Sequence, residues 1–87
     1  MAYEIHFEPK VIKRDLPKIP AANMDQIMRA IHERLTVDPV GLGKPLTGEF
    51  AGMRRLRVGD WRVIYDVSND KVFIHAIKLR RDAYKGL

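Results

Sequence analysis

The sequence predicts an α+β fold in which an N-terminal strand and a helical hairpin precede a three-stranded antiparallel meander, with the helices packed on one face of the sheet. Three patterns predict it. Apolar residues alternate near the N-terminus, recur at three- and four-residue steps mid-chain, and are divided by two hairpin turns in the final third. The 87 residues, of which 46% are hydrophobic, suffice for one core, so we expect a single domain over residues 1–87.

The first half of the chain carries the strand and both helices. Apolar and polar side chains alternate from Tyr3 to Glu8, which is typical of a strand with one buried face. Pro9 suits the first turn of a short helix that ends at Pro17 and Pro20. A second helix from about position 20 is predicted by an apolar stripe that we expect in the core: Met24, Ile27, Met28, Ile31 and Leu35.

A long irregular connection is expected between the second helix and the meander. Asp38-Pro39 ends the helix, and glycines and prolines recur as far as Gly52. The segment 41–44 has some likeness to a phosphate-binding loop, but it lacks the full Walker pattern and follows no predicted strand. Connections of this length are often functional.

The meander has three predicted strands, over residues 53–58, 61–68 and 71–78, joined by tight turns at Gly59-Asp60 and Asn69-Asp70. Turn length fixes which residues face each other. A two-residue first turn predicts the pairs Val58 with Trp61, Arg57 with Arg62, Leu56 with Val63, Arg55 with Ile64, and Arg54 with Tyr65. A two-residue second turn predicts Tyr65 with Ile74, Ile64 with His75, Val63 with Ala76, and Arg62 with Ile77. A three-residue second turn would shift the last strand and remove His75 from the arginine face.

Alternation along these strands separates two faces of the sheet. The face expected in the core bears Leu56, Val58, Trp61, Val63, Tyr65, Val67, Val72, Ile74 and Ala76. The face expected to be open and cationic bears Met53, Arg55, Arg57, Arg62, Ile64, Asp66, Phe73, His75 and Ile77. Asp66 is predicted to lie diagonally opposite Arg55, where an ion pair between them would reduce the positive charge of this face.

The charge balance favours an anionic partner. Lys and Arg number 16 against 11 Asp and Glu, giving a formal net charge of +5. Across the predicted pair, Arg57 and Arg62 would repel by about 0.7 to 3 kcal/mol at roughly 6 Å, which a bound phosphate would offset. A solvated charged face is the simpler interpretation. Because the planar arginine fork suits bidentate phosphate contacts, we expect an RNA or DNA backbone instead.

Three segments carry a family resemblance: residues 45–48 (PLTG), 53–65 (MRRLRVGDWRVIY) and 79–84 (LRRDAY). Together with the order of the predicted elements over essentially the whole chain, they resemble the RelE/ParE toxin superfamily. The resemblance implies a RelE-like fold and the toxin component of a type II toxin–antitoxin system. It further implies an endoribonuclease, because RelE-type members cut messenger RNA in the ribosomal decoding site.

The resemblance also implies roles for individual residues. Arg62 and Arg80 would stabilise the reacting phosphate, Tyr84 would stack on a base or assist proton transfer, and Arg55 matches a basic residue of the same site. The cations expected to bind RNA around these four catalytic candidates are Arg57, Arg81, Lys85 and Lys44.

The implied reaction is attack of an RNA 2′-hydroxyl on the adjacent phosphate. Arginine is always protonated, so none of the arginines is suited to accept the proton. The candidate proton acceptors are Tyr84, His75 and Lys85, of which Tyr84 ranks first, and the ribosome is able to supply groups of its own. The acceptor is left open.

Two positions depart from the RelE pattern and keep other functions open. Met53 stands where a second basic residue is expected, and Leu79 where many relatives have histidine. The alternatives are a ParE-like inhibitor that binds DNA gyrase without cleavage and a catalytically silent homologue that binds its antitoxin. Joint retention of Arg62, Arg80 and Tyr84 favours the nuclease.

The resemblance implies a cognate antitoxin, a toxin–antitoxin hetero-oligomer, and contact with the ribosome and mRNA. Because the expected arginine face is cationic, we expect the antitoxin segment to be acidic, partly flexible and folded on binding. No apolar stretch is long enough for a signal peptide or a membrane span, so a cytoplasmic location is expected. The chain has no cysteine, and its three histidines show no metal-ligand spacing, so neither a metal nor a cofactor is expected.

Overall fold

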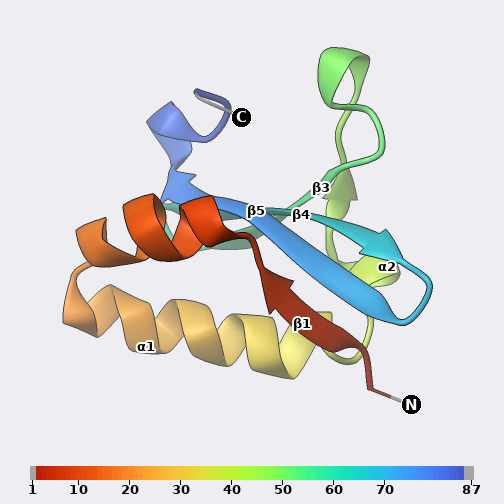
Figure 1. Ribbon diagram of the computed structural model, residues 1–87, viewed down its shortest axis with the longest axis horizontal. Coiled ribbons are helices and arrows are strands. Elements are labelled where there is room, and N and C mark those ends of the chain that lie inside the picture. Colours follow the sequence, from red (N-terminus) through yellow and green to blue (C-terminus); the bar gives the residue numbers. More distant parts are fainter. Residues whose placement is uncertain (1, 86–87) are drawn as a thin grey trace.

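The computed structural model describes residues 2–85, in which a layer of helices packs against a mixed sheet (Figure 1). Within these residues the sheet has five strands in the order β1-β5-β4-β3-β2, with β1 parallel to β5 and the other neighbours antiparallel. The strands are β1 (Glu4–Phe7), β2 (Lys44–Pro45), β3 (Arg54–Val58), β4 (Trp61–Ser68) and β5 (Lys71–Leu79). The predicted α+β fold is confirmed, with β1 and β2 extending the meander at its two edges.

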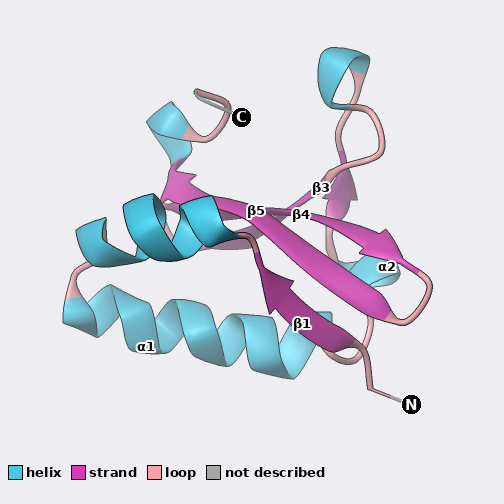
Figure 2. Ribbon diagram, viewed as in Figure 1, coloured by secondary structure: helices cyan, strands magenta, loops and turns pink. Residues whose placement is uncertain are grey.

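The helical hairpin forms as predicted. η1 (Val11–Asp15) and η2 (Leu16–Lys18) make its short first arm, and α1 (Ala21–Ala30) continues into the wider turn of η3 (Ile31–Leu35) as its second arm. Pro20 stands before α1 with φ −58° and ψ 146°, outside the helical region, and so separates the two arms. A short loop divides the two helical arms in Figure 2. No helix in the described part of the chain is long and apolar enough to cross a bilayer.

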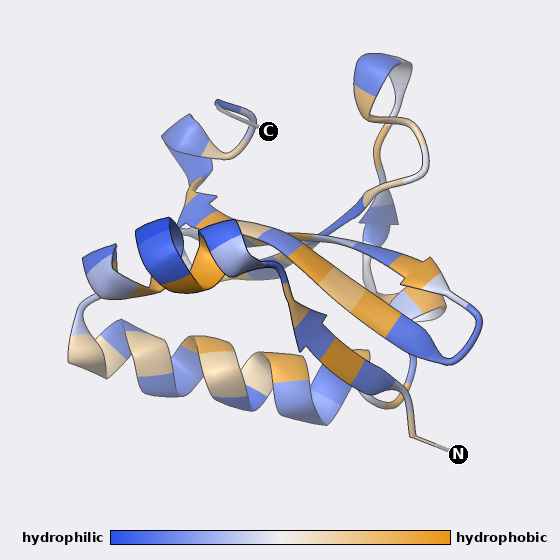
Figure 3. Cartoon of the chain, in the orientation of Figure 1, coloured by the Kyte–Doolittle hydropathy of each residue, from blue (hydrophilic) through white to orange (hydrophobic). Residues whose placement is uncertain are grey.

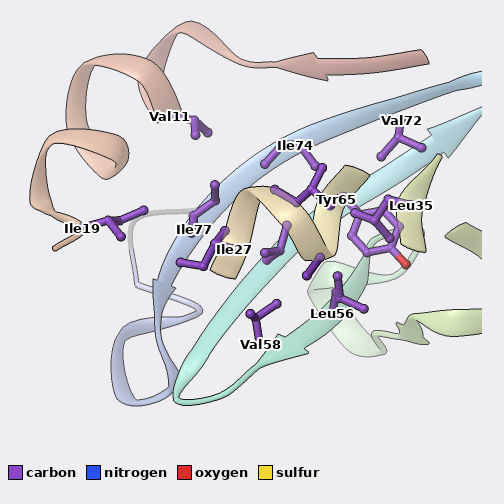
Figure 4. Close-up of a cluster of buried hydrophobic side chains, with 13 residues drawn as sticks. Val11, Ile19, Ile27, Leu35, Leu56, Val58, Tyr65, Val72, Ile74 and Ile77 are labelled. Atoms are coloured by element: carbon purple, nitrogen blue, oxygen red, sulfur yellow. The ribbon is translucent and has the colours of Figure 1, made fainter. Parts of the chain in front are cut away.

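Apolar side chains from the helices and the sheet form a shared buried cluster (Figure 4). Ile27, Ile31 and Leu35 of the second helical arm are at most 3% exposed. The sheet contributes Leu56, Val58, Val63, Tyr65, Val72, Ile74 and Ile77. Partly exposed residues packed against the cluster include Met24, Met28 and Trp61, on the side predicted for them. Hydrophobic residues accordingly run along the middle of β5 and recur on α1 (Figure 3).

The hairpin of β3 and β4 has the predicted register. Gly59 adopts a positive φ of 60° in the turn, which a glycine accepts without steric cost. The pairs from Val58 with Trp61 to Arg54 with Tyr65 all match the prediction. Arg57 therefore lies directly opposite Arg62.

The hairpin of β4 and β5 departs from the predicted register beyond Ile74. Tyr65 pairs with Ile74 as expected, but a β-bulge then adds His75 to β5 without a partner of its own. The observed pairs are Ile64 with Ala76, Val63 with Ile77, and Arg62 with Lys78. The predicted pairs Ile64 with His75, Val63 with Ala76, and Arg62 with Ile77 are therefore wrong. Ile77 was also placed wrongly on the open face, since the bulge turns it into the core, where it is 1% exposed.

A buried carboxylate completes the backbone pairing of β5 beyond the bulge. β1 ends at Phe7, so the edge of β5 beyond Ile74 is covered by η1 instead of a strand. Asp15 of η1 is 8% exposed, and its Oδ2 accepts a hydrogen bond of 2.9 Å from the N–H of Ile77. The Nζ of Lys78 lies 3.8 Å from the other oxygen. Asp15 therefore satisfies a buried donor that a neighbouring strand would otherwise have to pair.

The connection between helix and meander is more regular than the sequence predicts. It contains α2 (Pro39–Leu42), the short edge strand β2 and the turn η4 (Gly48–Phe50). The prediction of an irregular connection is therefore wrong, because a buried hydrogen bond orders the segment. The hydroxyl of Tyr65, a fully buried residue of β4, donates a hydrogen bond of 2.6 Å to the carbonyl of Pro39.

A second set of contacts fixes the same connection to β3. Nη1 of Arg54 donates to the carbonyls of Val40 and Gly43, at 2.9 and 3.3 Å. A Cβ at Gly43 would lie 1.7 Å from the Tyr65 hydroxyl oxygen, so the close approach requires glycine. Tyr65 and Arg54 thus order a connection whose own sequence gives no regular pattern.

Replacing Tyr65 with phenylalanine should lower the free energy of unfolding by about 1 to 3 kcal/mol, because the buried Pro39 carbonyl would lose its donor. Burial raises the pKa of Tyr65 from 10.0 to about 12, so the unfolded chain releases this proton at lower pH than the folded chain. The stability contributed by Tyr65 is therefore complete below pH 10 and is lost as the pH rises toward 12.

Urea unfolding near neutral pH and across the alkaline range measures both effects. At neutral pH, Tyr65→Phe should have a lower free energy of unfolding than the wild type. Between pH 10 and 12 its free energy of unfolding should fall less steeply than that of the wild type. Tyr3→Phe, at a half-buried tyrosine, serves as the control. Equal alkaline declines in the wild type and Tyr65→Phe would contradict the assignment.

Candidate functional site

A pocket of about 270 Å³ opens on the face of the sheet opposite the helices. Along β3 and β4 the core takes alternate residues, so the intervening arginines point to the other side. The pocket is lined by Arg55, Arg57, Arg62, Arg80, Ala83 and Tyr84. The structure therefore brings together all four residues that the sequence analysis named as catalytic candidates, and adds Arg57 to them.

Arg62 lies at the centre of the charge cluster and is only 6% exposed, although it belongs to the face expected to be open. Its Nη1 donates hydrogen bonds of 2.9 Å to the carbonyls of Gly59 and Trp61, which fixes the guanidinium against the hairpin turn. Burial lowers the pKa of Arg62, and the positive charges of Arg57, Arg80 and Arg55 lower it further, against a smaller opposing effect of Asp60. The side chain is thus a desolvated cation held by neutral carbonyl groups.

In the described part of the chain, the four pocket arginines have no carboxylate partner within 4 Å. Nε of Arg55 is buried and has no hydrogen-bond partner. Because buried donors are nearly always satisfied in native proteins, this orphan donor beside three other cations indicates a site that an anion completes.

The C-terminal segment closes one side of the pocket. The N–H of Arg80 donates to the carbonyl of Asp60 at 2.8 Å, which fixes the start of η5 (Arg80–Asp82) beside the β3–β4 turn. Ala83 is 2% exposed and anchors the segment, while Tyr84 remains 41% exposed. The ring of Tyr84 stacks on Phe50 of η4, with centroids 5.4 Å apart.

His75 is held away from the arginine pocket by two carboxylates. Nδ1 lies 2.5 Å from Oε1 of Glu8, and Nε2 lies 2.5 Å from Oδ2 of Asp66. With both ring nitrogens engaged and no place in the pocket lining, His75 is not arranged to accept a proton there. Asp66 consequently faces His75, and the suggested pairing of Asp66 with Arg55 is wrong.

The other predicted RNA-binding cations surround the pocket without lining it. Lys44 pairs with Arg55 across the edge of the sheet and is exposed. Arg81 and Lys85 are exposed on the C-terminal segment, each within 4 Å of the Asp82 carboxylate, at 3.9 and 3.4 Å. Lys85, the third candidate proton acceptor, is therefore outside the pocket, and Tyr84 is the candidate that the structure places in its lining.

The sequence reasoning missed two contributors to the site. Phe50 was grouped with the irregular connection, and Ala83 was not distinguished from its neighbours. Phe50 stacks on a residue of the C-terminal segment, and Ala83 lines the pocket with arginines of β3 and β4, and neither residue type nor spacing in the sequence indicates these meetings. In the described part of the chain, no group of three or more His, Cys, Asp or Glu side chains is arranged to hold a metal ion.

Fold and pocket together define a class of small basic protein with clustered guanidinium groups, one of them desolvated, on the open face of its sheet. The sequence profile of the ParE toxin of type II toxin–antitoxin systems (parDE) matches residues 5–84. The chain therefore belongs to the ParE toxin family. The predicted membership of the RelE/ParE superfamily, and with it the predicted role as a type II toxin, are confirmed.

Individual relatives agree with this family. The chain is 28% identical to Toxin RelG of Mycobacterium tuberculosis, over 98% of this chain and 99% of that protein. It is 29% identical to Toxin RelE of the same organism, over 78% and 70% of the two chains. Among solved structures it resembles the RelBE2 toxin–antitoxin complex of M. tuberculosis, with a TM-score of 0.85, 28% identity, and 94% and 95% of the two chains covered. The archaeal RelE–RelB complex from Pyrococcus horikoshii OT3 follows, with a TM-score of 0.71, 27% identity, and 95% and 100% covered.

The four pocket arginines repel one another, so they should lower the stability of the fold until an anion binds between them. Replacing Arg57 with glutamine removes one of the two like charges that face each other across β3 and β4, and should raise the free energy of unfolding at low salt by about 0.2 to 1 kcal/mol. The same change should reduce the extra thermal stability that phosphate confers over chloride at equal ionic strength.

Thermal unfolding in the two salts checks this prediction. Arg29→Gln, at an exposed residue of α1, is the matched control, because it accounts for the general stabilising effect of phosphate on proteins. A phosphate increment that is the same in both variants would count against an anion site at Arg57.

Proposed function

We propose that this toxin is a ribosome-dependent endoribonuclease that cleaves messenger RNA by attack of a 2′-hydroxyl on the adjacent phosphate. The observation that supports the proposal is the convergence of four arginines on one pocket without a carboxylate partner within residues 2–85, beside an exposed tyrosine ring. A pocket of this charge is suited to a phosphate that gains negative charge during reaction.

RNA supplies its own nucleophile, so the protein has to orient, neutralise and transfer protons. The 2′-oxygen forms a bond to phosphorus, and the bond from phosphorus to the 5′-oxygen breaks. The products are a 2′,3′-cyclic phosphate and a free 5′-hydroxyl. One proton leaves the 2′-hydroxyl, and one is delivered to the departing 5′-oxygen. Holding the sugar and phosphate in line accounts for a large share of such a rate increase.

Arg62 is the central group for neutralising the pentavalent phosphate. Its guanidinium is fixed by two carbonyls and desolvated, so it interacts with a developing charge in a low-dielectric setting and needs little reorganisation. Arg55 on β3 and Arg80 on the C-terminal segment line the same pocket as Arg62 on β4. Guanidinium groups from three segments would therefore surround the negative charge of the phosphate. Arg57 adds a fourth cation on the same hairpin.

Tyr84 has the other role in the proposed reaction. Its partly exposed ring in the pocket lining is available to stack on the base next to the reacting phosphate, and its hydroxyl is the candidate group for proton transfer. Exposed cations at Lys44, Arg81 and Lys85 extend positive charge along the backbone on either side of the cleaved link.

The proposed partners include a cognate antitoxin as well as the ribosome and mRNA. The solved relatives RelBE2 and archaeal RelE–RelB are toxin–antitoxin complexes. An acidic, flexible antitoxin segment complements a chain of net charge +5, and it would inhibit by covering the arginine pocket or displacing Tyr84 in a hetero-oligomer. Such a toxin acts in the cytoplasm, where translating ribosomes are found.

The match to the ParE family favours a second candidate function, inhibition of DNA gyrase by binding alone. Gyrase inhibition does not require four arginines gathered around a single pocket, so the pocket favours the nuclease over the inhibitor. A silent homologue that only binds its antitoxin would have the pocket but no effect on either target.

Induction of the toxin in cells should produce messenger-RNA 5′ ends in phase with codons, with gyrase supercoiling unaffected. Arg62→Ala and Arg80→Ala should each lower the cleavage rate by about 10²- to 10³-fold, because each removes a group that stabilises the transition state, and should relieve growth arrest. Mapping of 5′ ends, a supercoiling assay and growth curves measure these outcomes.

Two further variants make the result specific. Arg62→Lys keeps the charge but loses the planar fork, and should restore only part of the activity. Arg29→Ala should retain full toxicity. Wild-type toxicity in a folded Arg62→Ala or Arg80→Ala variant would refute the assignment, and gyrase inhibition without phased cuts would select the second candidate.

A further inference from the structure

Two projections rise from the sheet on the side away from α1 (Figure 1). One is the connection that contains η4, and the other is the C-terminal segment. One aromatic ring from each projection stacks on the other. Phe50 at the end of η4 stacks on Tyr84, with a centroid distance of 5.4 Å and 30° between the ring planes. The pair spans from one projection to the other beside the arginine pocket, which Tyr84 lines.

The connection has a defined shape that presents Phe50. The N–H of Leu46 donates to the carbonyl of Met53 at 2.9 Å and closes the base of the loop. Gly48, the first residue of η4, and Gly52, just after η4 ends, adopt positive φ values of 65° and 98°. A Cβ at either glycine would meet nothing within 4 Å, so these glycines serve the backbone bend and not close packing.

Phe50 lies outside the buried cluster that stabilises the fold. A large apolar ring at the end of a glycine-flanked loop has no role in that cluster, and its stacking partner is a residue of the functional pocket. The buried Ala83 precedes Tyr84 in the chain, and the Tyr84 ring is stacked on Phe50. Offset aromatic pairs prefer a defined geometry and so restrict the rings they join.

We propose that Phe50 is a positioning residue that holds the Tyr84 ring in place for the RNA base next to the cleaved phosphate. The inference rests on the proposed nuclease function and adds a residue that acts through Tyr84 without touching the reacting atoms. With Phe50 against it, Tyr84 is still 41% exposed, which leaves ring surface for a base. The base, the tyrosine and the phenylalanine then form a continuous stack that aligns the sugar and phosphate over Arg62.

Ring-proton resonances of Tyr84 in the free toxin test the stack without RNA. Phe50→Ala should shift them because the Phe50 ring current is lost, and Phe50→Tyr should keep them near their wild-type positions. Glu49→Ala, at the exposed residue next to Phe50, is the matched control and should leave them unchanged.

Single-turnover cleavage of ribosome-bound mRNA tests the role in the reaction. Phe50→Ala should lower the maximal rate about two- to tenfold, the range set by one aromatic pair, with the half-saturating toxin concentration unchanged. Phe50→Tyr should restore the rate, and Glu49→Ala should match the wild type. In a Tyr84→Ala background, Phe50→Ala should have no further effect.

The outcomes separate this proposal from the function on which it rests. Unchanged Tyr84 resonances in Phe50→Ala, or an equal loss of rate with and without Tyr84, overturn the positioning role and leave the nuclease intact. A wild-type toxin that shows the resonance shift in Phe50→Ala but never cleaves mRNA overturns the nuclease, and the positioning role in cleavage with it.

Discussion

The opposition of Arg57 and Arg62 across the β3–β4 hairpin is the constraint from which the functional pocket follows. Like charges in directly opposed positions are unfavourable, yet the fold cannot relieve them by a change of register. A shift by one residue would turn one of the two strands over, moving Leu56 or Val63 out of the core and an arginine of the same strand into it. Burial of the apolar face thus holds the arginines together on the other face.

The chain stabilises the central arginine without neutralising it. Carbonyl oxygens of Gly59 and Trp61 accept hydrogen bonds from Arg62, so its donors are partly satisfied while its charge remains. A carboxylate in the same place would have stabilised the folded state more and would have competed with phosphate for the guanidinium. The arrangement sacrifices stability at one point to keep an anion site available, which is common at functional sites.

Sequence reasoning succeeded where the determinants are local. Gly59-Asp60 specifies a two-residue turn, and alternation on both sides of it specifies which residues face the core, so the register of β3 with β4 and the arginine face could be derived. The bulge at His75 could not, because small Ala76 and larger Ile77 both suit an interior position. The choice depends on Asp15, which satisfies the N–H of Ile77 from 62 positions away.

The same limit applies to the edges of the pocket. Tyr65 ties the helix-to-meander connection to β4 through a hydrogen bond to Pro39, and Phe50 of the same connection stacks on Tyr84. Each contact joins residues with no pattern between them in the sequence. Family resemblance supplied Tyr84 and Arg80, but the residues that hold the site in shape come from the packing of distant segments.

Charged side chains are paired at one end of the open face and unpaired at the other. At one end Glu8 and Asp66 enclose His75, and Lys10 lies 3.8 Å from Glu8, so charges there have partners inside the protein. At the other end four arginines lie together, and within residues 2–85 none has a carboxylate partner. If the face only reflected the net charge of +5, we would expect basic and acidic side chains to be mixed at both ends. Segregation of paired from unpaired charge on a single sheet face therefore argues for a bound anion and against a merely solvated surface.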